Sequence, residues 1–395
     1  GLMGKRSLLL SVVGILVLLV GAWTAWWFYS ARLAMSSFQG WVSEQRSQGY
    51  DINFERIDTG GYPFSLALTA TRFGVAAPLR AWTVSGDALT VTFKPWQLDR
   101  YQVASDQPLR LSAVVIPESQ KTPVVIQDLT GDYLYQRDVS QHQLRLIAAD
   151  VSGPNGLTID TIGVSGTMPF HAPQDRDADI MTGHLELVGA KMPGLVPQGL
   201  SEQIEAAILD FTVSGPQPNP EHSMAKRLSD WRDAGGGVEV SKIALAWQDL
   251  NLSGDGTISL DEYLRPLAAF GMQATGLSET ARRFEGAGLI DRQIRRYIEM
   301  GVGLLSLGSG QAGMVRFPVT IQDGILSLGP VALTEIPPIV AGAGPLPPAV
   351  PAPKTGEITT FPDLAPPPTV SDETLDAGSN QMQGTDPQAA PAPAQ

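Results

Sequence analysis

The chain has 395 residues, of which 43% are hydrophobic and 17% are charged, so it has enough apolar side chains to form a folded core. A formal net charge of -13 argues against nucleic acid as a partner, because binding a phosphate backbone needs a concentrated basic surface. The absence of cysteine excludes disulfides, thiolate catalysis and sulfur-ligated zinc.

The N-terminal region predicts a membrane anchor. Residues 8–29 carry no charged side chain and match the roughly 20 residues that a helix needs to cross a bilayer. Lys5 and Arg6 precede this segment and predict a cytoplasmic N-terminus by the positive-inside rule. A cleaved signal peptide is the alternative, but its apolar core is usually only about 7–15 residues long. Aromatic residues over 23–29 suit the headgroup level.

The segment after the anchor predicts a helical stalk. Residues 30–48 fit a helix, and Gly49 follows in the position where glycine commonly ends one. The last residues are rich in proline and alanine and then acidic, a composition that buries too little apolar surface to fold. We therefore predict a cytoplasmic tip and transmembrane anchor (1–29), a stalk (30–50), an exported β-rich domain (51–345) and a disordered tail (346–395).

Alternating apolar and polar residues predict β-strands throughout the exported domain. Such runs occur at residues 65–71, 89–93, 109–111, 144–146, 185–187, 238–240 and 315–321. The expected fold class is mainly β, of the α+β type: a long, curved antiparallel meander sheet with a few packed helices. Trp82, Trp96 and Trp247 lie in or beside these runs, and we expect them to be core aromatics rather than side chains that line a groove.

Glycine and aspartate mark the predicted turns. Gly86-Asp87, Gly254-Asp255-Gly256 and Asp323-Gly324 each lie at an alternating run, and such pairs supply the positive φ angles of tight hairpins. We expect a hairpin tip at each position. The irregular spacing favours repeated hairpins over a solenoid of fixed period.

Two helical segments are expected to interrupt the strands. The first, residues 221–234, ends at consecutive glycines. The second, residues 278–307, starts with Ser278 as its N-cap and is expected to break near Gly286 and Gly288. Its latter half has an apolar face and a basic face, which we interpret as packing on the sheet with the arginines in water; contact with an acidic lipid surface is the alternative.

One segment resembles a calcium-binding loop. Asn251, Ser253, Asp255 and Glu262 occupy positions 1, 3, 5 and 12 of such a loop, with Gly256 at position 6. Asparagine at position 1 removes an anionic ligand, and the preceding residues alternate like a strand, whereas an EF-hand needs a helix there. We therefore interpret the segment as structural and predict no metal site.

Other candidate sites are also interpreted as structural. Residues 171–179 and His184 combine imidazole and carboxylate groups, but the alternating acids also describe a solvated loop. His142 and His222 have no recognisable companion acid and serine for a nucleophilic triad. The glycines within residues 301–310 lack the Lys-Ser or Lys-Thr of a phosphate loop. We expect no catalytic residue and no cofactor.

Four stretches together resemble a known family. They are residues 60–64, with Gly-Gly-Tyr-Pro-Phe; residues 231–236, with Trp-Arg-Asp-Ala-Gly-Gly; residues 245–261; and residues 323–330. In this order they resemble the bacterial domain-of-unknown-function family numbered 2125, over about residues 30–340. The family implies a location in the bacterial envelope and no particular biochemistry.

A looser similarity in layout relates the chain to AsmA-like envelope proteins, which are associated with lipid transport. From these resemblances and the anchor we expect a single-pass protein of the bacterial inner membrane, with its main domain in the periplasm. Our hypothesis is a non-enzymatic protein that binds lipid, or the apolar part of another envelope component, in a groove of its β-sheet. The alternative is a structural or scaffold protein of an envelope complex.

Overall fold

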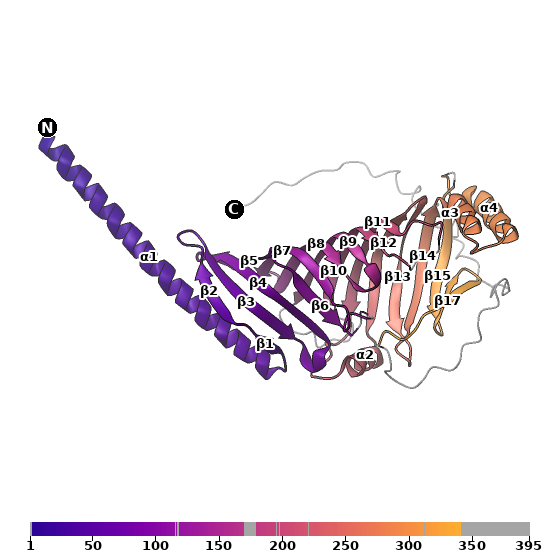
Figure 1. Ribbon diagram of the computed structural model, residues 1–395, viewed down its shortest axis with the longest axis horizontal. Coiled ribbons are helices and arrows are strands. Elements are labelled where there is room, and N and C mark those ends of the chain that lie inside the picture. The colour runs from indigo at the N-terminus through magenta and orange to yellow at the C-terminus, as the bar shows by residue number, and fades with distance from the viewer. Residues whose placement is uncertain are drawn as a thin grey trace, which may run out of the picture.

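The structure is one long antiparallel sheet with helices at its ends and margins (Figure 1). This computed structural model describes residues 2–340, apart from residues 115, 117, 170–178, 195, 197, 220 and 312. The tail predicted over residues 346–395 lies outside the described residues. The described part forms a 17-stranded sheet and the helices α1 (Leu2–Ser47), α2 (Met224–Asp233), α3 (Leu277–Gly286) and α4 (Arg292–Ser306).

The strands form an antiparallel meander, as predicted. From β7 onward each strand pairs with the next one along the chain. Two positions in the sheet are shared, because β1 and β2 both pair with β3, and β5 and β6 both lie between β4 and β7. The strands are β1 (Asp51–Asn53), β2 (Arg56–Gly60), β3 (Leu66–Ala76), β4 (Trp82–Lys94), β5 (Gln97–Ser105), β6 (Leu109–Ala113), β7 (Val124–Gln136), β8 (Gln141–Ser152), β9 (Thr158–Pro169), β10 (Asp179–Lys191), β11 (Gln203–Ser214), β12 (Gly237–Trp247), β13 (Leu250–Leu260), β14 (Pro266–Thr275), β15 (Val315–Gln322), β16 (Ile325–Leu328) and β17 (Val331–Glu335).

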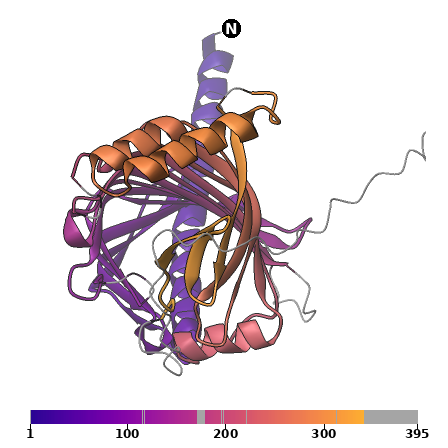
Figure 2. The ribbon, with the colours of Figure 1, turned by 90° about the vertical axis from the view of Figure 1, so that its right-hand side faces the viewer.

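Local irregularities bend the strands while one face of the sheet stays apolar. Asp150 in β8 and Gly189 in β10 have φ angles of 53° and 67°, outside the ordinary β region. In β7, Ile126 and Leu129 would point to opposite faces of a regular strand, yet both pack against the buried cluster around Val151. Bulge-like irregularities of this kind increase the local twist. The end-on view of Figure 2 shows the resulting curvature, with α3 and α4 along one margin and α2 at the opposite margin.

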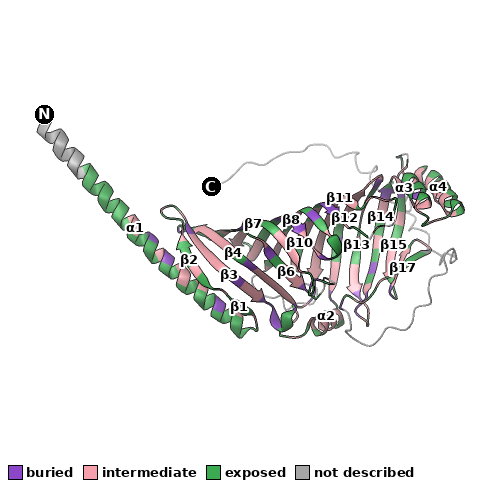
Figure 3. Ribbon diagram, in the orientation of Figure 1, coloured by how far each residue is buried: buried purple, intermediate pink, exposed green. Residues whose placement is uncertain are grey.

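The helix α1 is unbroken, but its two halves have different surroundings. Every described side chain from Val12 to Val20 is exposed, and this half stands free of the sheet (Figure 3). In the other half, Trp27 and Val42 are buried against the first strands. The helix is long and apolar enough to cross a membrane, a property that signal sequences share. The segment predicted as a stalk is helical, ends before Gly49, and lies beside the sheet.

Only one of the three predicted hairpin tips is a turn. Asp323 and Gly324 connect β15 to β16 with φ angles of 52° and 75°, as expected. The prediction was wrong for Gly86-Asp87, which lies inside β4, and for residues 254–256, which lie inside β13. In these strands the missing side chain makes room for a neighbour: a Cβ on Gly254 would lie 2.5 Å from the sulfur of Met272.

The short helices follow the sequence pattern with one change. The expected break separates α3 from α4, and the side chain of Asp291 caps α4 by accepting a hydrogen bond from the Ile294 amide at 2.8 Å. The predicted cap at Ser278 was wrong, because α3 begins one residue earlier, after Gly276. Gly276 has a φ of 79°, and a Cβ there would lie 1.8 Å from the Asp249 carbonyl oxygen, so no other residue fits.

Candidate functional site

One face of the sheet carries an unbroken row of apolar residues. Directly paired residues can be followed from β3 to β15, and each of them is apolar or glycine. We call this set the apolar row: Leu68, Val91, Val103, Gly131, Leu146, Val164, Leu185, Leu209, Ile243, Gly254, Met272 and Phe317.

The neighbouring residues of the same strands form a contrasting row on the opposite face. Because successive side chains of a strand alternate between faces, Ser165 lies opposite to Val164, and His184 opposite to Leu185. We call this second set the polar row: Thr92, Gln102, Asp132, Arg145, Ser165, His184, Asp210 and Lys242. We name the two sides of the sheet the apolar face and the polar face after these rows, although exposed Ile147 and Val188 also lie on the polar face.

Helices cover the apolar face only locally. Trp27 and Ala31 of α1 pack against Leu66, and Trp231 of α2 packs with Val213 and Val238. Among the described residues, the buried cluster around Val151, which joins β7 to β11, contains no residue of a helix α1 to α4. In that region the side chains of the apolar face remain accessible, at 40% for Leu144, 40% for Val164 and 45% for Met168. Apolar surface exposed over several adjacent strands is typical of an interaction site.

Three polar side chains lie side by side on the apolar face. The Tyr101 and Tyr133 rings are 5.8 Å apart, and the Tyr133 hydroxyl is hydrogen-bonded to Nδ1 of His142. Burial raises the pKa values of both tyrosines and lowers the pKa of His142, since it disfavours the charged forms. These groups therefore stay neutral at pH 7 and add no charge to the apolar face.

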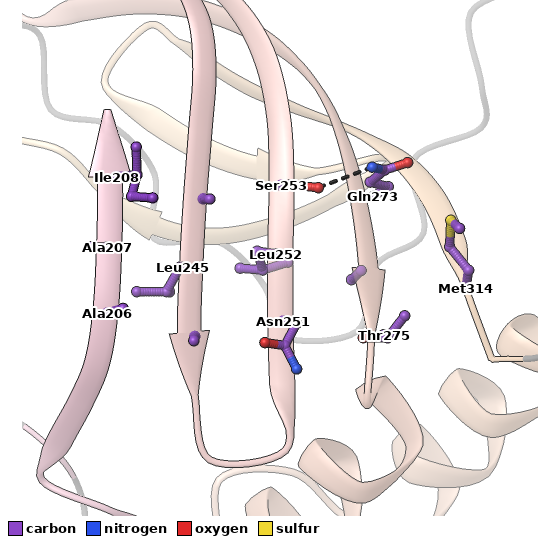
Figure 4. A pocket seen from close by; sticks show the side chains of 13 residues that line it. Ala206, Ala207, Ile208, Leu245, Asn251, Leu252, Ser253, Gln273, Thr275 and Met314 are labelled. Carbon is purple, nitrogen blue, oxygen red and sulfur yellow. Dashed lines mark hydrogen bonds between the residues drawn. The ribbon is translucent and has the colours of Figure 1, made fainter. Parts of the chain in front are cut away.

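A pocket of about 320 Å³ lies over β11 to β14 and is bounded by Met314, which precedes β15 (Figure 4). Its walls are largely small side chains, including Ala206, Ala244 and Ser253, and Gln273 Nε2 donates a hydrogen bond of 3.0 Å to Ser253 Oγ. Ala244, Ser253 and Gln273 are directly paired neighbours on the polar face. The pocket therefore opens on the side of the sheet opposite to the apolar row.

The calcium-loop lookalike has strand geometry. Asn251, Ser253 and Asp255 all lie on β13, and Glu262 follows that strand. Alternate residues of a strand are about 6.6 Å apart, so these side chains cannot converge on one ion. In the described part of the chain, no group of three or more His, Asp or Glu side chains is placed to hold a metal.

The histidine candidates are only partly described. Residues 171–178 lie outside the described part of the chain. His184 is in the polar row, where its Nδ1 is hydrogen-bonded to Asp210 of the next strand and its Nε2 lies 4.0 Å from Glu186. His222 Nδ1 is 3.2 Å from an Asp230 oxygen. Both histidines thus take part in surface pairs of the folded chain.

The prediction that Trp96 is a core residue was wrong. Its side chain is 56% exposed, and its ring lies 5.6 Å from the ring of Trp23 in α1. Trp82 and Trp247 are half-buried, and Trp247 Nε1 donates to the Ser201 carbonyl oxygen. Sequence reasoning missed the role of Trp96, because it depends on a contact between positions that are far apart in the chain.

The helix α4 is the most exposed of the short helices and has no buried residue. Its outward side carries Tyr297, Met300 and Leu304, and Leu307 follows at its C-cap; their exposed fractions run from 59% to 82%. The basic face is partly neutralised, because Arg295 pairs with Glu285 and Glu299. The apolar side chains therefore do not all pack on the sheet as expected.

Comparison with known proteins gives one match. The model of the family described as "Uncharacterized protein conserved in bacteria (DUF2125)" matches residues 27–337. The searches of curated proteins and of solved structures found no match. The match spans every strand of the sheet and the half of α1 that packs on it. The chain therefore belongs to this conserved bacterial DUF2125 family.

Proposed function

We propose that this protein binds lipid along the apolar face of its sheet, in a non-enzymatic role at the bacterial inner membrane. The observation that carries the proposal is the apolar row, which runs without interruption from β3 to β15, together with the buried cluster around Val151, to which no described helix contributes a residue. Each methylene group removed from water there is worth about 0.8 kcal/mol. Binding of this kind needs no particular hydrogen-bond donor or charge.

The length of the face supports acyl chains as ligands. Neighbouring strands are about 4.8 Å apart, so the apolar row is roughly 50 Å long. That exceeds the roughly 30 Å thickness of a bilayer's hydrocarbon core. One lipid, or several arranged along the sheet, would fit on this surface.

The location in our proposal follows from α1. If α1 is retained as an anchor, Lys5 and Arg6 favour a cytoplasmic N-terminus and place the sheet in the periplasm. The packing of Trp27 on Leu66 supports retention, because cleavage of α1 after residue 27 would remove Trp27 and expose Leu66.

Photo-crosslinking from adjacent positions tests lipid binding. A photoreactive amino acid at Val164 faces the apolar side, and the same group at Ser165 faces the polar side of the same strand. We expect lipid adducts at position 164 and several-fold fewer at position 165, detected by mass spectrometry of protein purified from cells. Equal yields at the two positions, or no lipid at either, would contradict the proposal.

A second candidate is a scaffold within an envelope complex, and the exposed side of α4 favours it. Crosslinking from Leu304 tests this function, with the exposed Leu79 at the β3–β4 connection as the control position. A defined protein adduct at residue 304 alone would support the scaffold. No adduct at residue 304 would leave lipid binding as the better proposal.

A further inference from the structure

The end of the sheet beside α1 carries exposed apolar side chains that are separate from the apolar row. Two of them are in the β2–β3 loop, where Tyr62 is 48% and Phe64 is 73% exposed. Two more are Trp96 in the β4–β5 turn, which is 56% exposed, and Leu98 at the start of β5, which is 59% exposed. We call Tyr62, Phe64, Trp96 and Leu98 the tip.

Hydrogen bonds hold the tip at a defined height on α1. The indole nitrogen of Trp23 donates to the Pro63 carbonyl oxygen at 2.7 Å, and that of Trp27 donates to the Ser65 carbonyl oxygen at 2.7 Å. The hydroxyl groups of Thr24 and Tyr62 are also hydrogen-bonded, at 2.8 Å. Buried indole N–H groups need such acceptors, so these contacts fix the β2–β3 loop to the helix.

The contact residues of α1 lie at the end of its apolar segment. A helix rises about 1.5 Å per residue, so a span of roughly 30 Å that begins near Leu8 ends near Trp27. Trp26 and Tyr29, which are 49% and 60% exposed, lie at the same level. Exposed Trp and Tyr side chains are typical of the membrane–water boundary. The tip therefore lies at the depth where α1 leaves the hydrocarbon core.

We propose that the tip inserts into the headgroup and upper acyl region of the bilayer that α1 crosses. The occupant of this surface is phospholipid, because hydrogen bonds hold the tip beside α1, and the apolar segment of α1 needs lipid around it. Lys94, whose Nζ lies 6.0 Å from the centre of the Trp96 ring, adds a positive charge beside lipid phosphates. The sheet then begins in the membrane, and the apolar row starts next to its lipid source.

This inference rests on the proposed function, since it places α1 in a membrane. With the tip in the bilayer, the predicted stalk does not separate the sheet from the membrane. Residues 30–47 instead run away from the bilayer alongside the first strands. Phe64, Trp96 and Leu98 act by partitioning, and no reaction is assigned to them.

Single-cysteine labelling of the full chain in phospholipid nanodiscs tests the depth of the tip. The chain has no cysteine, so Phe64→Cys and Leu98→Cys each provide one labelling site. The control is Leu79→Cys, which is 66% exposed and lies between β3 and β4, at the other end of β3. Each variant carries a polarity-sensitive nitrobenzoxadiazole label.

We expect labels at residues 64 and 98 to fluoresce at shorter wavelength and to be quenched by headgroup-nitroxide phospholipid. Iodide in the buffer should quench them several-fold less than the label at residue 79. Iodide quenching equal to that at residue 79 would overturn the inference. Protection from iodide without quenching by nitroxide lipid would also overturn it, since it would indicate a second copy of the chain on the tip.

The results separate the two proposals. Lipid adducts at Val164 combined with a water-exposed tip would refute tip insertion and leave lipid binding standing. A tip in lipid without adducts at Val164 would refute lipid binding on the apolar face and leave tip insertion standing. Unchanged melting temperature of each cysteine variant is the control for folding, because both tip positions are exposed and leave no cavity.

Discussion

Asp261 organises the connection between β13 and β14 through several contacts at once. One carboxylate oxygen accepts hydrogen bonds from the Tyr263 and Arg265 amides, each at 2.9 Å. The other accepts from Arg265 Nε at 2.6 Å, and the two side chains are only 16% and 5% exposed. Arg232 adds a hydrogen bond of 2.9 Å to the Asp261 carbonyl oxygen. The hydrogen bond from Arg232 joins two of the stretches that resemble the family, residues 231–236 and 245–261.

Removal of this carboxylate should destabilise the fold. Asp261→Ala leaves the Arg265 guanidinium buried without its partner, and we expect a loss of about 3–5 kcal/mol in the free energy of unfolding. Asp58→Ala is the matched control, because Asp58 pairs with Arg56 on the surface and its removal should cost less than about 1 kcal/mol. Urea denaturation in mild detergent measures both. Equal losses would contradict the assignment.

His142 should make stability depend on pH. Burial lowers its pKa in the folded chain, so below the unfolded value of about 6.5 the unfolded chain binds a proton that the folded chain does not. The contribution is therefore fully present above about pH 6.5 and is lost as pH falls toward the folded pKa. Denaturation at pH 8, 7, 6 and 5 should show a smaller acid-induced loss for His142→Gln. The same pH dependence in variant and parent would refute this.

At the scale of elements, glycines inside strands decide how closely neighbouring strands pack. A Cβ on Gly254 of β13 would lie 2.3 Å from the Gly271 carbonyl oxygen and 2.5 Å from the sulfur of Met272. Gly271 of β14 has nothing within 4 Å of its Cβ position. We expect Gly254→Val to destabilise the protein by about 1–3 kcal/mol, since the strands must separate.

The control for that prediction is Gly271→Val, which should be neutral or slightly stabilising because valine favours strands. Thermal melting of both variants in the same detergent compares them. A loss at residue 271 as large as at residue 254 would indicate that loss of glycine flexibility, and not the clash, is responsible.

The element boundaries show what local patterns can predict. The alternating runs correctly marked β3, β4, β6, β8, β10, β12 and β15, and the Gly286–Gly288 region marked the break between α3 and α4. Gly-Asp pairs were ambiguous, because the same residues serve a turn at Asp323-Gly324 and close packing at Gly254. Which role a glycine has depends on the bulky side chain opposite to it, such as Met272, and that partner is set by strand register.

At the scale of the whole molecule, the sheet connects α1 at one end with α3 and α4 at the other (Figure 1). If lipid enters beside α1, a charge in the middle of the apolar row should block its passage. We expect Leu185→Lys to reduce lipid adducts from a photoreactive group at Met272 several-fold, and to leave those from Val103 unchanged. Burying the added ammonium among acyl chains is unfavourable, which is the physical reason.

The matched control is His184→Lys, which places the same charge on the polar face of the same strand. Mass spectrometry of adducts from protein purified from cells measures the effect. Equal reduction at residues 272 and 103 would indicate general loss of binding instead of blocked passage. An unchanged yield at residue 272 would contradict entry from the α1 end.

The sequence by itself determined the class of this protein: an apolar N-terminal helix, a β-rich body of antiparallel strands, helices in the predicted places, and membership of a conserved family. These properties follow from hydrophobicity and periodicity, which act over a few residues. Tertiary structure decided that the apolar residues of separate strands join into one row, that Trp96 meets Trp23, and that the calcium-loop lookalike is a strand. Each of these depends on register and on contacts between distant residues, and local sequence patterns do not encode such contacts.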